Sequence, residues 1–306
     1  MNDGRRTPSQ HRGSILIVTL WLVSILSVLA IAIGRYLSFE IRLTKYRLAR
    51  EQTRTLARDG VYLAMQRLDR DAADDQERYD WLQDDWATIT PIDLPEGHQL
   101  AVEIVDEERK LNLNRVVEDP VMLTAVGTLV ESPSLAVKIL DYIDSDLEPT
   151  SPDGLETDPT AQPPYVAKNG PVVVHEELLN IPGIEEALET LRQSTSVAPS
   201  MGKLNINTAA PDVLRALGFS GPAVQALQAC REQGTIFKEH STILTTAETC
   251  GLGDAERSLL INEFGVTSQT FTIISRAISE QPAVVVRVET VVQRSPELRI
   301  LAWREQ

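Results

Sequence analysis

The sequence predicts an α+β fold: a long N-terminal helix packs on an antiparallel sheet, and a large α-helical domain is inserted into that unit. Three observations carry this prediction. An apolar run over residues 14–33 passes directly into a longer amphipathic helical pattern. The middle of the chain contains several short helical patterns. The C-terminal residues 266–306 are rich in Val, Ile and Thr and are typical of strands.

The N-terminal segment carries its positive charge before the apolar run. Arginines precede Gly13, and residues 14–33 include no charged side chain. At 1.5 Å per helical residue the run spans about 30 Å, the thickness of a bilayer core. A secretory signal has its small-residue cleavage site after the apolar region, whereas Gly13 lies before it. Cleavage after Gly13 would leave a membrane helix beginning at Ser14. The basic flank predicts a cytoplasmic leader and a remainder outside that membrane, in the periplasm if the cell is a Gram-negative bacterium.

Beyond residue 33 the apolar residues recur every three, four or seven positions, with charges between them. No proline interrupts residues 14–90, so one helix is expected to run to about Leu68. Leu100–Val105 alternates as a strand, and Leu111–Leu113 is expected to pair back onto it. Thr208 is expected to cap a helix that follows it. The expected units are a leader over 1–13, a membrane half-helix over 14–33, an amphipathic helix with first strands over 34–118, a helical domain over 119–265 and final strands over 266–306.

Composition excludes some classes of function. The formal net charge is −15, which argues against a nucleic-acid-binding protein because phosphate binding requires a basic face. No nucleotide-binding, hydrolase or zinc-protease motif occurs, so no enzyme is predicted. The chain has two cysteines, Cys230 and Cys250. They either form a disulfide, which an oxidising compartment permits, or are two small buried residues that never meet.

An acidic loop follows the first helices of the inserted domain. Residues 141–158 contain seven carboxylates and no basic residue. Such a loop is either solvated and kept apart by its own charge, or it binds Ca²⁺, which prefers six to eight oxygen ligands. The spacing is not that of an EF-hand.

Two segments are similar to the turn of a helix-hairpin-helix, Leu179–Ile184 and, more weakly, Leu217–Gly221. In DNA-binding proteins such turns direct backbone N–H groups at phosphate. Here the neighbouring residues include several glutamates, which would repel phosphate. A tight turn between packed helices is therefore the favoured interpretation.

Several motifs in order resemble the K-type minor pseudopilins of type II secretion systems, over nearly the whole chain. They are Arg12-Gly13 with the apolar run, Arg50–Gln52 with Ala57–Val61, Lys110–Asn114 after Asp106, Leu140–Asp146, Ala167–Pro171 and Leu204–Ala209. The resemblance implies a pilin-like fold with a prepilin-type leader. Most pilins carry a glutamate five residues after the cleaved glycine, where this chain has Val18. The K-type subunit lacks that glutamate, and its absence suits a cap with no subunit above it.

The resemblance implies a non-catalytic minor pseudopilin that caps the periplasmic pseudopilus and supports export of folded proteins across the outer membrane. It implies cleavage after Gly13 by a prepilin peptidase, methylation of Ser14, an inner-membrane anchor, and I- and J-type minor pseudopilins as partners. It also implies structural Ca²⁺ in the helical domain; the expected ligands are Asp144, Asp146, Glu148, Glu156 and Asp158. Alternatives are a plain signal anchor, a membrane-anchored helix-hairpin-helix protein that binds nucleic acid, and a minor pilin of a type IV pilus.

Overall fold

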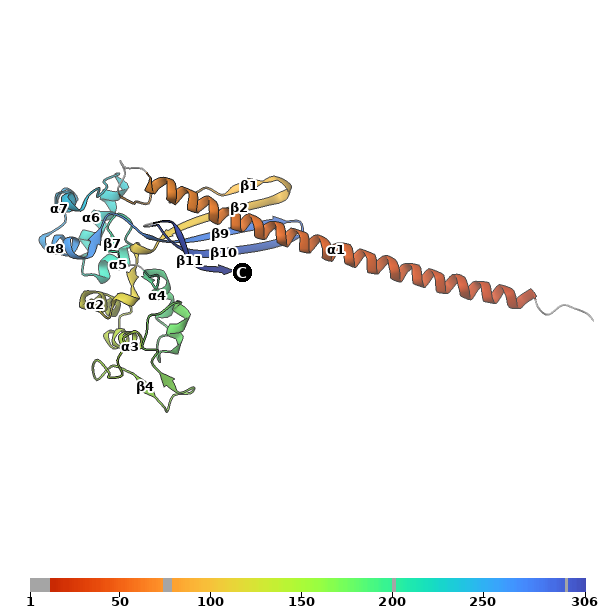
Figure 1. The fold of residues 1–306 in the computed structure, drawn as a ribbon, viewed down its shortest axis with the longest axis horizontal. Helices are drawn as coiled ribbons and strands as arrows, with labels where there is room; N and C mark the ends of the chain where they lie inside the picture. The colour runs from red at the N-terminus through yellow and green to blue at the C-terminus, as the bar shows by residue number, and fades with distance from the viewer. Residues whose placement is uncertain (1–11, 74–78, 200–201, 295–296) are drawn as a thin grey trace, which may run out of the picture.

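The structure, a computed structural model, describes residues 12–73, 79–199, 202–294 and 297–306. Its most prominent feature is helix α1, Arg12–Ala72, which runs for 61 residues. At 1.5 Å per residue its length is about 90 Å. Figure 1 shows the first part of α1 extending away from the rest of the molecule, while its last turns lie along a sheet. The helix thus ends slightly beyond the expected Leu68.

The sheet has five strands in the order β1-β2-β9-β10-β11, and all its pairings are antiparallel. The strands are β1 Ile92–Leu94, β2 His98–Asp106, β9 Thr270–Glu280, β10 Ala283–Gln293 and β11 Arg299–Glu305. Strands β2 and β9 are neighbours in the sheet although more than 160 residues separate them, with Asp106 opposite Phe271. Everything between these two strands is therefore an insertion into the sheet unit.

Helix α1 covers one face of this sheet and forms the first hydrophobic core with it. Alternate residues of β2, β9 and β10 point to the helix, since successive side chains in a strand point to opposite faces. Phe271 is fully buried here, and the Trp86 ring meets it edge-on with centroids 5.2 Å apart. Other members of this core are Ala57, Val61, Ala64, Leu68, Leu100, Val102, Ile273, Val286 and Val288.

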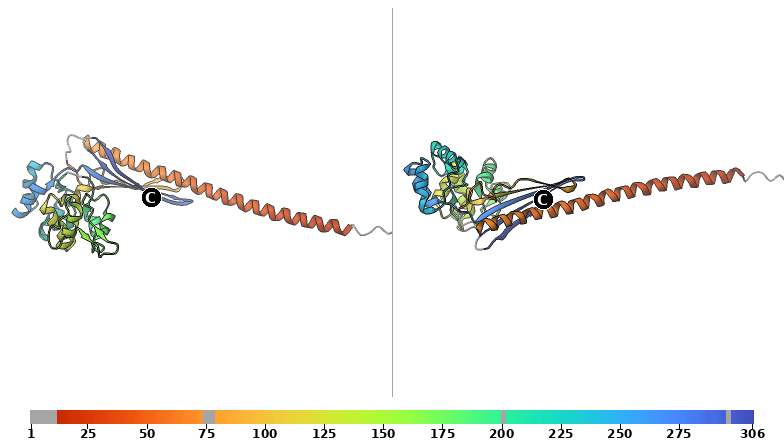
Figure 2. Two further views of the ribbon diagram at one scale, coloured as in Figure 1. Left: turned by 60° about the horizontal axis from the view of Figure 1, so that its bottom comes forward. Right: turned by 90° about the horizontal axis from the view of Figure 1, so that it is seen from above.

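The inserted segment forms a second, larger core of its own. It lies at the end of the sheet where α1 stops, away from the free part of α1 (Figure 2). Its α-helices are α2 Pro120–Leu129, α3 Pro133–Ile143, α4 Leu188–Ser194, α5 Pro211–Ala216, α6 Gly221–Glu232, α7 Ile243–Thr249 and α8 Asp254–Glu263. Its short strands are β3 Leu111–Asn112, β4 Thr157–Asp158, β5 Tyr165–Val166, β6 Thr195–Ser196, β7 Leu204–Asn205 and β8 Phe264–Gly265. Turns of 3-10 helix cover Pro95–Gly97, Glu107–Arg109, Leu113–Arg115, His175–Asn180 and His240–Thr242.

Two local expectations are wrong. Leu111–Leu113 does not pair back onto β2; instead β3 pairs in parallel with β6, and Leu111 and Leu113 enter the core of the helical domain. That core therefore starts earlier in the chain than residue 119. Thr208 does not cap the next helix, because the N-cap of α5 is Ala210 and the Thr208 hydroxyl binds Asp106.

Candidate functional site

The apolar half of α1 is not covered by the rest of the chain. Every side chain from Ile15 to Phe39 is exposed, and Val18 is 53% exposed. Within the described residues α1 is the one helix long and apolar enough to cross a membrane. A soluble monomer rarely exposes an apolar surface of this extent, so the segment requires a bilayer or packed neighbours.

The predicted processing residues lie at the start of this helix. Gly13 and Ser14 are in the first turn of α1, whereas leader residues 1–11 fall outside the described part of the chain. The structure places Val18 on the second turn, where an aliphatic side chain needs no charged partner inside a membrane.

The other half of α1 is held closely against the sheet at Gly60. A Cβ at this position would lie 2.9 Å from Leu100 Cδ1 and 3.0 Å from Val102 Cγ2, so glycine permits the close approach. At the sheet's edge, Arg54 and Arg58 both form ion pairs with Glu305 of β11. The hydrogen bond from Arg54 is the main reason that the pKa of Glu305 is lowered.

A buried polar network joins the two cores. Asp106, at the end of β2, accepts hydrogen bonds from Thr208 Oγ1 at 2.5 Å and Ser268 Oγ at 2.7 Å. Asn205 of β7 donates to Ser268 Oγ at 2.8 Å. Burial raises the pKa of Asp106 to about 6, although these hydrogen bonds oppose the shift. The network spans more than 160 residues of sequence, and local pattern gives no signal for it.

Arg294 forms the second part of this junction. Its guanidinium lies 2.7 Å from Asp71 Oδ2 at the end of α1 and 2.7 Å from both carboxylate oxygens of Asp80. It also lies over the Phe271 ring, 5.0 Å from the centroid. Burial and then repulsion from Asp80 raise the pKa of Asp71 to about 7, against the attraction of Arg294. These contacts fix how the helical domain sits relative to α1.

An acidic cluster forms where α3 enters the acidic loop. Carboxylate oxygens of Asp141, Asp144 and Glu156 all lie within 4.8 Å of one another. Asp141 is fully buried and accepts the backbone N–H groups of Thr150 at 3.1 Å and Leu155 at 2.7 Å. These hydrogen bonds curl the loop back over α3.

Several oxygens at this cluster are buried and accept no hydrogen bond within normal geometry from the described residues. They are Asp144 Oδ1, both carboxylate oxygens of Glu156, Tyr165 Oη and Asn169 Oδ1. Burial, followed by repulsion from other carboxylates, raises the pKa of Asp144 and of Glu156. Unpartnered buried oxygens around mutually repelling carboxylates match the chemistry of a hard divalent cation. The donor set therefore fits Ca²⁺.

The structure brings together only part of the predicted ligand set. Asp144 and Glu156 are in the cluster, and Asp146 is near enough to raise the pKa of both. Glu148 and Asp158 do not belong to the group; Asp158 instead accepts hydrogen bonds from Thr160, which lower its pKa. The central residue of the cluster is Asp141, which the predicted set lacks. The sequence signal for Asp141 was its position among apolar residues at the end of a helix.

Cys230 of α6 and Cys250, which follows α7, form a disulfide with Cα atoms 5.7 Å apart. Both are buried in the second core. The bond links α6 to the C-terminal end of α7.

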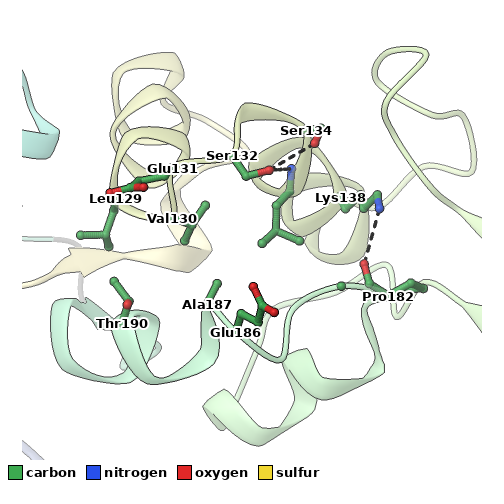
Figure 3. Close-up of a pocket in the computed structure, with 12 residues that line it drawn as sticks. Leu129, Val130, Glu131, Ser132, Ser134, Lys138, Pro182, Glu186, Ala187 and Thr190 are labelled. Carbon is green, nitrogen blue, oxygen red and sulfur yellow. Dashed lines mark hydrogen bonds between the residues drawn. The ribbon is translucent and has the colours of Figure 1, made fainter.

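The hairpin over residues 179–184 has a structural role in the second core. Ile181 and Ile184 are fully buried, and Gly183 adopts a φ of +89° that favours glycine. Beside it is a cavity of about 540 Å³ between this turn and the α2–α3 connection (Figure 3). Glu131 and Glu186 lie at the cavity, and the Lys138 ammonium donates to the Pro182 carbonyl at 3.4 Å. This acidic surface is unsuited to phosphate.

Comparisons with known proteins agree with this architecture. No protein-family model matches the chain. The chain is 28% identical over 226 residues to the type II secretion system protein K of Pseudomonas aeruginosa, covering 68% of each chain. Its fold is similar to a chain in the crystal structure of the GspK-GspI-GspJ complex from the type 2 secretion system of enterotoxigenic Escherichia coli. That similarity has a TM-score of 0.71 and 18% identity, and covers 86% of this chain and 99% of the other. The predicted α+β, pilin-like fold is confirmed.

Proposed function

We propose that this chain is a K-type minor pseudopilin of a type II secretion system, caps the tip of a periplasmic pseudopilus and supports export of folded proteins. The single observation that carries this proposal is the uncovered apolar half of α1 joined to a bulky helical domain at the opposite end of the molecule (Figure 1). The helix supplies the packing surface of a filament subunit. The role proposed is structural and not catalytic.

The position of the helical domain supports a place at the tip. The domain lies beyond the end of the sheet, on the side away from the free part of α1 (Figure 2). In a filament whose shaft is built from the apolar helices, a domain there occupies the space that the next subunit above would need. Val18 supports the same place, because a top subunit has no helix above it whose amine needs a carboxylate partner.

Processing and location follow from the same helix. We expect a prepilin peptidase to cleave after Gly13 and to methylate Ser14, and we expect α1 to anchor the mature chain in the inner membrane. The disulfide between Cys230 and Cys250 supports a periplasmic location for the helical domain, since disulfides persist in oxidising compartments. Mass spectrometry of the mature N-terminus tests the processing step. A chain that begins at Met1 would contradict it.

The expected partners are I- and J-type minor pseudopilins, the other components named for the similar complex. Purified mature chain should capture both from a detergent extract. A variant with Gly13→Lys, which blocks cleavage, should not assemble.

Calcium is the proposed structural ion of the helical domain. Asp141, Asp144 and Glu156 would hold it, with Asn169 Oδ1 as a neutral oxygen nearby. Bound there, Ca²⁺ would neutralise repelling carboxylates and fix the acidic loop. Asp141 already has two backbone partners, so it positions the loop as well as supplying a ligand oxygen.

Secretion itself gives the decisive test. Deletion of the gene is expected to stop the appearance of exported proteins in the medium, and the wild-type gene is expected to restore it. Undiminished secretion in the deletion strain would overturn the proposed function. The acidic surface at the hairpin and the net charge of −15 oppose the alternative of nucleic-acid binding.

A further inference from the structure

A band of positive charge lies on α1 immediately beyond its apolar half. Over residues 34–51 the cations are Arg35, Arg42, Lys45, Arg47 and Arg50, and the acids are Glu40 and Glu51. This concentration stands out in a chain with 44 acidic and 29 basic residues. We refer to these five cations as the basic collar.

The cations of the basic collar have no partner within the described part of the chain. All five side chains are exposed, and none forms an ion pair or hydrogen bond there. Farther along the same helix the arginines behave differently, since Arg54 and Arg58 are both paired with Glu305. The unpaired charge is thus confined to the stretch next to the membrane-spanning run.

The arrangement around the helix distinguishes a lipid surface from a protein partner. At about 100° per residue, Arg35 and Arg42 lie on one face, while Lys45 and Arg47 point in nearly opposite directions. A neighbouring subunit would contact one face of α1. The basic collar spreads over about 200° of the circumference, which is wider than one packing face, and a layer of headgroups can contact all of it.

The distances along α1 suit the headgroup layer. Arg35 is two residues beyond Ile33, and Arg42 and Lys45 lie about 14 and 18 Å beyond it. The headgroup region is about 5–7 Å thick on each side of the core, and its surface charge acts over a further Debye length of about 8 Å. Long side chains that snorkel towards the interface cover the remainder. A tilted helix also brings Arg47 and Arg50 closer. Tyr36, which is 63% exposed, lies where interfacial aromatic residues are enriched.

These cations are not explained by a role in setting the orientation of α1 in the membrane. Positive residues usually accumulate on the side that stays in the cytoplasm. Here five lie on the exported side, against three arginines in the leader, so they oppose the usual bias. We propose that the basic collar binds anionic phospholipid headgroups, such as phosphatidylglycerol, in the outer leaflet of the inner membrane and holds the subunit there before it enters a filament.

Lipid selectivity in a reconstituted membrane tests this proposal. The full mature chain is placed in phosphatidylcholine vesicles that contain spin-labelled phosphatidylglycerol or spin-labelled phosphatidylcholine. Electron paramagnetic resonance then gives the fraction of each lipid that the protein immobilises. At 50 mM NaCl the wild type should prefer phosphatidylglycerol by at least about threefold, and 0.5 M NaCl should remove most of that preference.

Matched triple variants separate the basic collar from net charge. Substitution R35Q/R42Q/K45Q should bring the preference to about one. The control R192Q/R215Q/R276Q removes the same charge from exposed sites on the head and should leave the preference unchanged. Equal thermal unfolding of the two variants shows that the head is folded in both.

Two results would overturn the proposal. One is equal immobilisation of both lipids by the wild type, and the other is a preference that survives in R35Q/R42Q/K45Q. If there is no lipid preference but this variant loses its minor pseudopilin partners, the basic collar binds protein instead. The secretion assay is independent of these outcomes, so failure here leaves the proposed function standing.

Discussion

Glu156→Gln is expected to stabilise the metal-free protein and to reduce the further stabilisation that calcium gives. Ligand oxygens of Asp141, Asp144 and Glu156 lie within 4.8 Å of one another. Two unit charges at that separation repel by about 3.5 kcal/mol at an effective dielectric constant near 20. Replacing Glu156 by its neutral amide removes two of the three repulsions. The metal-free variant should therefore unfold at a higher temperature than the metal-free wild type.

Calcium should stabilise the variant less than it stabilises the wild type. A ligand at one hundred times its Kd stabilises the folded state by about 2.7 kcal/mol. For a domain of this size that corresponds to a rise in Tm of about 5–10 °C. Glu156→Gln should weaken binding at least about tenfold, since it removes one charged ligand. At the same calcium concentration a tenfold weaker Kd leaves about 1.4 kcal/mol of stabilisation, so the variant should lose at least about half of this rise. Simple structural damage would lower Tm in both states, so a higher Tm in chelator together with a smaller gain from calcium is specific to a metal site.

The assay is calcium titration by calorimetry on the mature chain in detergent, together with thermal unfolding in calcium and in chelator. Asp158→Asn is the matched control, because Asp158 lies in the same loop but outside the cluster. It should bind calcium as wild type does. Absence of calcium binding by the wild type, or equal loss of affinity in Asp158→Asn and Glu156→Gln, would refute the assignment of these ligands.

Other perturbations test the packing, the disulfide and the junction. Gly60→Ala should destabilise the head, because overpacking costs about 1–3 kcal/mol and the gain in helix propensity is only about 1 kcal/mol. Gly34→Ala should not destabilise it, because the space around Gly34 is open. Urea unfolding measures both. Cys230 and Cys250 are 20 residues apart in sequence, and replacing both by serine removes their cross-link. The free energy of unfolding should fall by about 3 kcal/mol. Reductant should lower the stability of the wild type by the same amount and should not change that of the variant. The raised pKa of Asp71, about 7, means that the folded state binds this proton more tightly than the unfolded chain does. Its contribution to stability should therefore be present near pH 4 and lost as pH rises to about 7, and Asp71→Asn should flatten urea-unfolding stability over that window.

Elements whose stabilising contacts are local in sequence could be predicted from sequence. The continuous pattern without proline gave α1 nearly to its end at Ala72. Strands β9 and β10 form a hairpin, so alternation and the intervening Gln281–Pro282 were sufficient. The predicted pairing of β3 was wrong because its partner is not local in sequence. Leu111 is apolar and follows a turn, which is typical of a returning strand, but its partner is Thr195 in a distant segment.

The acidic cluster shows a different limit. Composition pointed to the loop and the resemblance implied calcium, yet neither could select among seven carboxylates. Selection depends on which side chains the loop turns inward, and the backbone N–H groups of Thr150 and Leu155 decide this by binding Asp141. Gly154 takes part as well, because a Cβ there would lie 3.1 Å from Asp141 Cγ. Such closures are set by tertiary geometry, which residue spacing does not encode.

The polar junction between the two cores orients the helical domain relative to α1, and this orientation matters for the proposed assembly. A tip subunit must hold its head at a fixed angle to its helix, because a head that swings would open the space above it to another subunit. Arg294 links the last turn of α1, through Asp71, to the buried Asp80. Asp80 in turn accepts the Ser268 N–H at 2.6 Å, next to the network around Asp106. Removing one partner of such a buried ionic group costs about 3–5 kcal/mol because the other charge stays desolvated. The angle of the head is therefore fixed by polar contacts that must all form together, while the apolar half of α1 remains free to pack in a filament.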